Sequence, residues 1–274
     1  MITASLVLYH SPDDQVSRIL DCIQQSIIDK VFVIDNSSCK NSELLCAKFS
    51  KAEYQCHDNT GYGDSHNIGM RKALDLKSDY HLVVNPDIYF DKELVETLKK
   101  YMDENIDVAQ IMPKIINPSG ELQYLCKLIP SPFDLIFKRF FPGKIKEKMS
   151  YKFQLKFTDY NHIMNVPYLS GCFMFFRTKV FETVGMFDER FFMYPEDIDI
   201  TRRMHEQYKT IYYPFVSVVH DHAAESYHSK KMLKIHITNM IKYFNKWGWL
   251  FDKKRKQINK KVLEELNYKE LRRK

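Results

Sequence analysis

Two short segments of the chain concentrate side chains that bind cations and move protons. Residues 85–87 read Asn-Pro-Asp and follow an apolar run, and residues 196–199 hold three carboxylates within four positions. Hard divalent cations take oxygen ligands, and one protein carboxylate suffices when a substrate diphosphate supplies the others. A carboxylate next to aromatic side chains, such as those in 191–194, is suited to act as a general base. Together the two segments favour a cation-assisted reaction of a phosphorylated substrate.

Each segment also has a simpler structural explanation. Asn-Pro-Asp is a common way to begin a turn, because Asn and Asp bond their own backbone and Pro fixes one dihedral angle. Carboxylates at a helix start are stabilised by the helix dipole, which accounts for Glu196, Asp197 and Asp199 without any chemistry. Both explanations stay open from the residues alone.

A glycine-rich stretch precedes the first of these segments. Asn59, Gly61, Gly63 and Asn67 lie where a predicted strand gives way to a predicted helix. Glycine lets a backbone approach a ligand closely, and a helix N-terminus attracts phosphate. The stretch lacks the spacing of a dinucleotide fingerprint or a P-loop, so a plain glycine loop is the alternative. His220 ends a later predicted strand, and it is either a structural residue or a ligand of a metal or phosphate.

The elements that position these residues follow from the periodicity of the sequence. Short apolar runs predict buried strands, and apolar residues at helical spacing predict helices, the first of which begins at a capping Ser11. In the first half, strands are predicted at 3–9, 31–34, 53–56 and 81–84, and further helices at 42–50, 64–77 and 91–102. In the second half, strands are predicted at 167–176 and 210–220, and helices at 178–184, 197–206 and 226–246.

This alternation predicts an α/β fold with a mixed, mostly parallel sheet flanked by helices. Ligands of such sheets bind at the carboxyl ends of the strands, and Asp35, Asn59 and Asp87 all come directly after predicted strands. We expect a catalytic domain at 1–225, which includes a basic and aromatic insertion at 127–152. Amphipathic helices and a basic tail are expected at 226–274.

Composition and charge bound the remaining possibilities. The 274 residues are 45% hydrophobic and 28% charged, which predicts a folded globular protein without extensive disorder. The net charge is +6, and in residues 250–274 ten Lys or Arg oppose four acids, which fits an anionic ligand or membrane surface. The six cysteines form no Cys-x-x-Cys pair, which argues against a zinc site. We expect no signal peptide and no membrane-spanning run.

In combination, these segments resemble the GT-A glycosyltransferases of family 2, close to the bacterial rhamnosyltransferases that build O-antigens and other surface polysaccharides. The resemblance extends over nearly the whole chain and depends on the order and spacing of its motifs. The matching segments are 33–38, 59–69, 85–87, 170–174, 185–202, 220–226 and 240–244. The resemblance implies a GT-A fold and a sugar transfer from a nucleotide-diphosphate donor.

The resemblance also assigns residues to the donor. Tyr9 and Asp35 are expected to hold the pyrimidine base. The residues expected to line the rest of the nucleotide pocket are Asn36, Asn59, Gly61, Gly63, Asn67 and Asn85. Asp87 matches the metal-binding end of the family's Asp-x-Asp motif, in which Asn85 replaces the first acid. His220 is expected as a further ligand of Mn²⁺ or Mg²⁺.

On the acceptor side, Asp197 matches the family's catalytic base, and Glu196 is expected to be catalytic beside it. The implied reaction is inverting: an acceptor hydroxyl loses its proton to Asp197 and attacks the anomeric carbon, while the cation screens the leaving diphosphate. The expected donor is dTDP-rhamnose, with another UDP- or dTDP-sugar as the alternative. The expected acceptor is a glycan or a polyprenyl-diphosphate-linked glycan. Residues 133–141 and 247–256 are then expected at the inner face of the plasma membrane of a cytoplasmic protein.

Two other functions compete with this one. A sugar nucleotidyltransferase requires a glycine-rich, arginine-containing loop after the first strand, but here that strand leads into residues 9–12, Tyr-His-Ser-Pro. A non-catalytic nucleotide-sugar-binding protein would not require Asp87, Glu196 and Asp197 together. Nucleic-acid binding is not expected, because the basic tail belongs to no recognised nucleic-acid-binding module.

Overall fold

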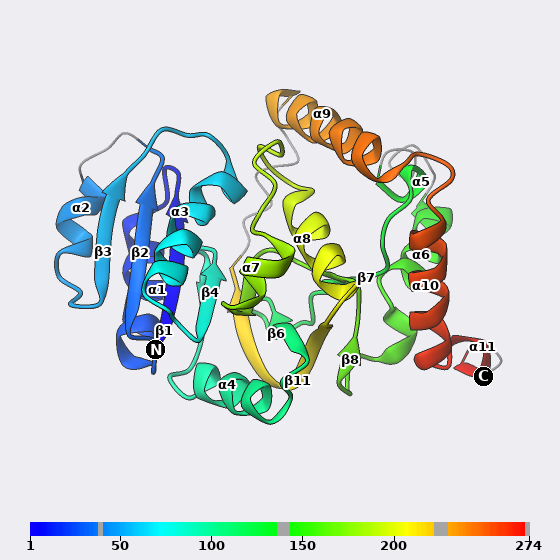
Figure 1. The fold of residues 1–274 in the computed structure, drawn as a ribbon, viewed down its shortest axis with the longest axis horizontal. Helices are drawn as coiled ribbons and strands as arrows, with labels where there is room; N and C mark the ends of the chain where they lie inside the picture. Colours follow the sequence, from blue (N-terminus) through cyan, green and yellow to red (C-terminus); the bar gives the residue numbers. More distant parts are fainter. Residues whose placement is uncertain (38–40, 136–142, 222–229, 272–274) are drawn as a thin grey trace.

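The computed structural model describes residues 1–37, 41–135, 143–221 and 230–271. Among these residues, nine strands form one mixed sheet in the order β3-β2-β1-β4-β10-β6-β11-β5, and β8 also pairs with β11. Helices flank the sheet (Figure 1), so the predicted α/β class is confirmed. The strands of this sheet are β1 (Ile2–Leu8), β2 (Lys30–Asp35), β3 (Ala52–Cys56), β4 (Tyr80–Val84), β5 (Ile88–Tyr89), β6 (Val108–Ile116), β8 (Met164–Asn165), β10 (Phe173–Arg177) and β11 (Lys209–His220).

The first half of the chain folds much as its periodicity predicts. Strands β1 to β4 pair in parallel, and β1 is buried along almost its whole length. Their helices are α1 (Asp13–Gln25), α2 (Asn41–Cys46), α3 (Tyr62–Asp75) and α4 (Leu94–Glu104). Two details of the prediction are wrong. Pro12 occupies the cap position of α1, where Ser11 was expected, and α2 ends at Cys46.

The second half departs further from its prediction. The run 167–176 is not one strand, because it divides into β9 (Tyr168–Leu169) and β10, which belong to different sheets. Strand β9 pairs with β7 (Cys126–Lys127), and β10 runs antiparallel between β4 and β6. The central strand β6 is missing from the prediction, because it contains Pro113, which is unfavourable inside a sheet. Its partner β11 has an irregular register after Tyr213, the residue opposite that proline.

The second half also contains two of the predicted helices. Helices α7 (Val180–Val184) and α8 (Glu196–His205) both lie close to their predicted positions. Helix α8 carries acids in its first turn and Arg202, Arg203 and His205 in its last turn, as the helix dipole favours. Seven consecutive residues of α8, 196–202, are buried, so its N-terminus faces the interior of the protein.

The C-terminal residues form helices that pack back on the fold. They are α9 (Lys230–Trp247), α10 (Lys253–Glu265) and α11 (Tyr268–Leu271), and they are accompanied by α5 (Pro132–Leu135), α6 (Gly143–Phe153) and η2 (Lys156–Thr158). Figure 1 shows α9 next to α8 and α10 next to α6. The Asn259 side chain of α10 exchanges two hydrogen bonds of 2.9 Å with the backbone of Ile129. Residues 226–229 of the predicted helix and 136–142 of the insertion lie outside the described residues.

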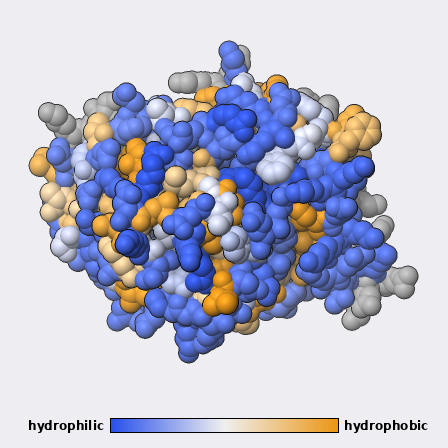
Figure 2. Space-filling model, in the orientation of Figure 1, coloured by the Kyte–Doolittle hydropathy of each residue, from blue (hydrophilic) through white to orange (hydrophobic). Residues whose placement is uncertain are grey.

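The face seen in Figure 2 is mostly hydrophilic, with small hydrophobic patches. Within the described ranges, no helix combines the length and the apolar character needed to cross a bilayer. The cysteines in the described part of the chain are unpaired thiols, mostly buried as expected, and Cys56 is the exposed one among them.

Candidate active site

The turn after β4 carries the first part of the candidate site. The backbone N–H of Asn85 donates to the carbonyl of Cys172 at 3.0 Å, which ties this turn to the start of β10. The Tyr62 hydroxyl, from the first turn of α3, lies 3.0 Å from Oδ1 of Asn85 and 2.8 Å from the carbonyl of Gly171. Burial raises the pKa of Tyr62 well above its usual value, so this hydroxyl stays a donor. Tyr62 thus joins α3 to both strand ends.

Asp197 is held at the N-terminus of α8 and is only 7% exposed. Its Oδ2 accepts a hydrogen bond of 3.0 Å from the backbone N–H of Gly171, and its Oδ1 accepts one of 2.7 Å from Ile198. Burial raises the pKa of Asp197 to about 6, whereas the charge of Lys127 and the two N–H groups lower it. A carboxylate with a pKa near neutrality is suited to accept a proton in a transfer reaction.

Glu196 lies beside Asp197 and is also buried, with 5% of its surface exposed. Burial, followed by the charge of Asp197, raises the pKa of Glu196 well above its usual value. Its Oε2 has no hydrogen-bond partner in the described part of the chain. Two adjacent carboxyl groups whose environments separate their pKa values can take different protonation states. Burial and the neighbouring charge thus favour the protonated form of Glu196, whereas Asp197 is ionised more readily.

Asp87 and His220 meet near Tyr62, whose pKa is raised by burial and further by the charges of Glu196, Asp197 and Asp87. Oδ2 of Asp87 lies 3.4 Å from Nε2 of His220. The amide of Gln123 donates to the carbonyl of His220 at 3.0 Å, so its oxygen faces Nδ1 of His220 at 2.8 Å. Because an amide oxygen only accepts, Nδ1 carries a proton, and Nε2 is the ring nitrogen that faces Asp87. A second residue that fixes the tautomer in this way is typical of metal-binding histidines.

These two side chains fit a cation that is shared with a ligand. Among residues 1–37, 41–135, 143–221 and 230–271, no group of three or more His, Cys, Asp or Glu side chains is arranged to hold a metal ion. A carboxylate and an imidazole leave most of a divalent ion's coordination positions to water or to a diphosphate. The protein part of the site therefore fits a metal that binds together with its donor.

The residues expected to bind the base lie at the ends of β1 and β2. Tyr9 is 53% exposed, with its ring beside His10. Asp35 is fully buried: Oδ1 accepts from the N–H of Ser37 at 2.8 Å, and Oδ2 accepts from the hydroxyl of Tyr54 at 3.0 Å. Exposed Tyr9 is accessible to a base, whereas Asp35 is engaged within the protein. Contact of either residue with a nucleotide stays a prediction.

The glycine-rich stretch turns out to bind another part of the chain. Gly61 has φ +124°, and a Cβ there would lie 2.6 Å from the carbonyl oxygen of Phe192. The same oxygen accepts the N–H of Tyr62 at 2.9 Å. A Cβ on Gly63 would meet the side chain of Phe187 at 2.9 Å. The glycines let α3 pack closely against residues 185–195, which lead into α8.

The carboxamides near this stretch have different surroundings. Asn67 is buried, and its amide exchanges two hydrogen bonds with the backbone of Phe187, at 2.9 and 3.0 Å. Asn36 is also buried, and its Nδ2 donates to Oγ of Ser65 at 2.7 Å. Asn59 is exposed. The structure therefore gives Asn67 a part in holding residue 187, and the contacts of all three carboxamides with a donor stay predictions.

Sequence reasoning does not single out three of the residues that complete this geometry. In the sequence, Tyr62 is distinguished only as the aromatic residue between two glycines, and Lys127 is one of several cations in a basic insertion. Nothing in the sequence distinguishes Gln123, which contacts His220 over a separation of 97 residues. All three depend on long-range packing, which local patterns do not reveal.

Comparison with known proteins agrees with this geometry. The model of the family described as Glycosyl transferase family 2 matches residues 13–185. The chain is 26% identical over 199 residues to the low-salt glycan biosynthesis hexosyltransferase Agl10 of Haloferax volcanii, covering 72% of this chain but only 60% of that protein. It is 25% identical over 247 residues to the rhamnosyltransferase WbbL of Escherichia coli K12, covering 87% of this chain and 90% of WbbL.

Other relatives and solved structures extend the comparison. An N-acetylglucosaminyl-diphospho-decaprenol L-rhamnosyltransferase of Mycobacterium tuberculosis is 25% identical over 181 residues, covering 61% of this chain and 57% of that protein. S. aureus TarS 1-349 in complex with UDP has a TM-score of 0.56 at 14% identity, over 96% of this chain and 70% of that one. The mannosyltransferase PcManGT of Pyrobaculum calidifontis, in complex with GDP-Man and Mn²⁺, has a TM-score of 0.58 at 13% identity, over 88% and 64%. These likenesses identify the fold as GT-A.

Proposed function

We propose that this chain, which belongs to glycosyl transferase family 2, transfers a sugar with inversion from a nucleotide-diphosphate donor to an acceptor hydroxyl. The observation that carries the proposal is the presence of two kinds of group near Tyr62. One is the pair of Asp87 and His220, 3.4 Å apart, and the other is the buried carboxylate of Asp197, whose pKa is raised to about 6. An alcohol needs a base to become a good nucleophile, and a diphosphate needs its charge screened to leave.

The roles follow from where each group lies. Asp197 accepts the proton of the acceptor hydroxyl, and the N–H groups of Gly171 and Ile198 hold its carboxylate in one orientation. Asp87 and His220 would hold a divalent cation, which would supply positive charge to the leaving diphosphate. Tyr62 fixes Asn85 and Gly171 relative to each other. Glu196, protonated beside Asp197, leaves a single negative charge on the pair.

The relatives support a particular donor and acceptor. The names of two of them include rhamnosyltransferase, and one name includes a diphospho-decaprenol. We therefore infer dTDP-rhamnose as the donor, with another UDP- or dTDP-sugar as the alternative, and a polyprenyl-diphosphate-linked glycan as the acceptor. An acceptor of this kind is held at a membrane, which suits a role in the synthesis of a surface polysaccharide such as an O-antigen.

The segment between α9 and α10 supports contact with such a membrane, but fewer of its aromatic side chains face outward than the sequence predicts. Trp247 faces inward, with its ring 3.8 Å from the Arg202 guanidinium, and Trp249 packs on Phe244. Leu250 and Phe251 are 70% and 87% exposed, and exposed lysines follow them at 253, 254 and 256. Apolar side chains next to cations suit the surface of an anionic bilayer, here the inner face of the plasma membrane.

Vesicle flotation tests this contact. We expect the protein to float with anionic vesicles, weakly with neutral ones, and less at high salt. Replacement of Leu250 and Phe251 by Ser should abolish flotation without changing transfer to a water-soluble acceptor. Equal flotation of the double variant would refute the membrane contact.

A donor screen tests the transferase itself. Candidate dTDP-, UDP- and GDP-sugars are titrated into the protein with Mn²⁺, with Mg²⁺ or with EDTA, and unfolding temperature and sugar transfer are measured. A donor that binds the native state raises the unfolding temperature, and we expect that rise only when a cation is present. Stabilisation by dTDP-rhamnose without transfer to any acceptor would favour a binding protein over an enzyme.

A further inference from the structure

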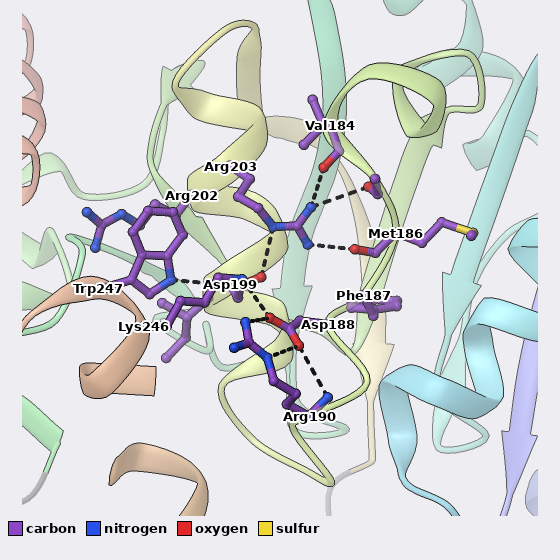
Figure 3. Close-up of polar contacts among 12 residues, drawn as sticks. Val184, Met186, Phe187, Asp188, Arg190, Asp199, Arg202, Arg203, Lys246 and Trp247 are labelled. Carbon is purple, nitrogen blue, oxygen red and sulfur yellow. Dashed lines mark hydrogen bonds and ion pairs between the residues drawn. The ribbon is translucent and has the colours of Figure 1, made fainter. Parts of the chain in front are cut away.

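Asp199 is the third carboxylate of the 196–199 cluster, and the proposed reaction does not use it. It is completely buried two residues after Asp197. Oδ1 accepts a hydrogen bond of 2.7 Å from Nε1 of Trp247 and pairs with Nζ of Lys246 at 2.6 Å. Oδ2 accepts one of 2.8 Å from Nε of Arg203 (Figure 3). A buried carboxylate with charged donors on both oxygens is held in one position, because the loss of any partner leaves a charge unsolvated.

Two of these donors end α9, and the connection continues into α10. The Trp247 ring stacks on the guanidinium of Arg202, which is 1% exposed. Arg202 makes a bidentate pair with Asp252, at 2.7 and 2.9 Å. Asp252 also caps α10, because its Oδ1 accepts the N–H of Arg255. The helix that carries the base is thus bonded to the end of one C-terminal helix and to the start of the next.

The same groups fasten the segment that enters α8. Arg203 donates to the carbonyls of Val184 and Met186, each at 2.6 Å. Lys246 pairs with Asp188 at 2.7 Å as well as with Asp199 (Figure 3). The 184–188 segment is therefore held from α8 on one side and from α9 on the other.

Helix α9 also holds the last residues before the base. Lys242 donates to the carbonyl of Arg190 at 2.8 Å, and Asn239 donates to that of Met193 at 3.1 Å. Tyr194, the next residue, has φ +94°, a conformation that costs energy for a residue with a side chain. Such a turn persists only where its surroundings impose it, and here they include contacts from α9 and the packing of Tyr194 on His236.

We infer that Asp199 and Trp247 are positioning residues for the transfer reaction, which fix the first turn of α8, and with it Asp197, against the C-terminal helices. This inference rests on the proposed function, because it gives Asp197 the part of the base. Asp197 meets Gly171 through one hydrogen bond of 3.0 Å, so a small shift of this turn breaks the contact. Misplacement of a reacting group by about 1 Å can cost about a hundredfold in rate.

The decisive variant is Trp247→Phe, which removes the indole N–H from Asp199 and keeps an aromatic ring over Arg202. We expect kcat with a water-soluble acceptor to fall about tenfold, which corresponds to about 1.4 kcal/mol in the barrier. The donor KM and the donor dissociation constant should stay within about twofold, because the Asp87 and His220 side does not contact this network. The acid limb of the kcat profile should move to higher pH, because the Gly171 N–H that lowers the pKa of Asp197 is weakened.

The matched control is Trp249→Phe, two residues further along the same segment. Its indole N–H also makes a hydrogen bond, of 2.8 Å, but to Asn245 on the surface. This control should keep wild-type kcat and pH dependence. Asp199→Asn gives a second test if it folds, with a larger loss of kcat, and Trp247→Phe decides alone if it does not.

The outcomes separate this inference from the proposed function. A Trp247→Phe enzyme with wild-type kcat and only a lowered unfolding temperature would leave the network purely structural and overturn the inference. Wild-type transfer by Asp197→Asn would overturn the proposed function instead. Inactive Asp197→Asn together with a tenfold slower Trp247→Phe supports both.

Discussion

The proposed donor side and the proposed acceptor side of this site are held by different kinds of structure. On the donor side, Asn85 and Asp87 follow β4 within a run of parallel strands, and their neighbour α3 comes from the same half of the chain. On the acceptor side, Asp197 is fixed by Gly171, and its helix is bonded to Trp247, 50 residues later. A site divided in this way allows changes on one side to leave the other intact.

Asp197→Asn gives the largest expected effect and tests that division directly. Removal of a general base lowers a rate by about 10²- to 10⁴-fold, so we expect a loss of kcat in this range. Donor affinity in the presence of Mn²⁺ should not change, because the amide keeps the volume of the carboxylate. Calorimetric titration of the donor and a radiolabelled transfer assay measure the two quantities. A parallel loss of donor affinity would show that the two sides are not separable.

Asp87→Ala is the reciprocal change on the donor side. It removes one of the two side chains placed to hold a cation, so Mn²⁺-dependent donor affinity should fall about 10- to 100-fold, comparable to the loss of a group that supports a metal site. Donor binding in EDTA should equal that of the wild type. Asp91→Ala, four residues further along the chain and outside the site, is the control. Unchanged stimulation by Mn²⁺ in the variant would remove Asp87 from the metal site.

Gly61→Ala probes the contact between the two sides. The new Cβ would meet the carbonyl oxygen of Phe192 at 2.6 Å, at φ +124°, so we expect a loss of about 1–3 kcal/mol in the free energy of unfolding. Gly120→Ala also has a positive φ, +85°, but nothing lies within 4 Å of its Cβ, so its loss should be smaller. Urea denaturation compares the two variants. Equal losses would mean that dihedral strain, and not the close packing of α3, sets the requirement for glycine.

The smallest expected effect concerns the pH dependence of the acceptor side. Asp197 must be ionised to act as a base, so activity should fall as the pH drops through about 6. The positive charge of Lys127 lowers the pKa of Asp197, so Lys127→Met should raise it and move the acid limb to higher pH. At pH 7 the loss of rate should stay below about tenfold, since one pKa unit is worth about 1.4 kcal/mol. The control is Lys156→Met, which removes a lysine that lies over the ring of Tyr124. This variant should keep the acid limb of the activity profile at the wild-type pH.

The same contrast explains how far the sequence predicts the molecule. The parallel strands of the first half are continuous apolar runs with helices between them, and such runs are visible locally. The position of Asp87 after a strand was predictable for this reason. The break between β9 and β10 lies at Ser170-Gly171, a dipeptide typical of turns, which the single predicted strand at 167–176 ran across. Yet that break exposes the Gly171 N–H that orients Asp197.

Other parts of the site escape prediction for a related physical reason. A proline inside β6 contradicts the usual preference of central strands. Its partner β11 contains a proline of its own, Pro214, at the point where the register between the two strands becomes irregular. The Gly61 to Asn67 stretch was expected to line the nucleotide pocket, and that role stays a prediction; in the structure, Gly61 and Gly63 allow close packing with Phe187 and Phe192. Glycine permits the close approach of a ligand and the close packing of another segment alike, so a glycine alone does not show which of the two lies beside it.

The hydrogen bonds from α9 to the loop before Asp197 determine which substitutions that loop can tolerate. Asn239 and Lys242 bind the carbonyls of Met193 and Arg190, and a carbonyl is present whatever amino acid occupies the position. These two hydrogen bonds therefore do not depend on the side chain at either position. The Arg190 side chain makes separate contacts, because it bonds both carboxylate oxygens of Asp188. Substitution of Met193 should leave the course of the loop unchanged, whereas substitution of Arg190 removes its pair with Asp188.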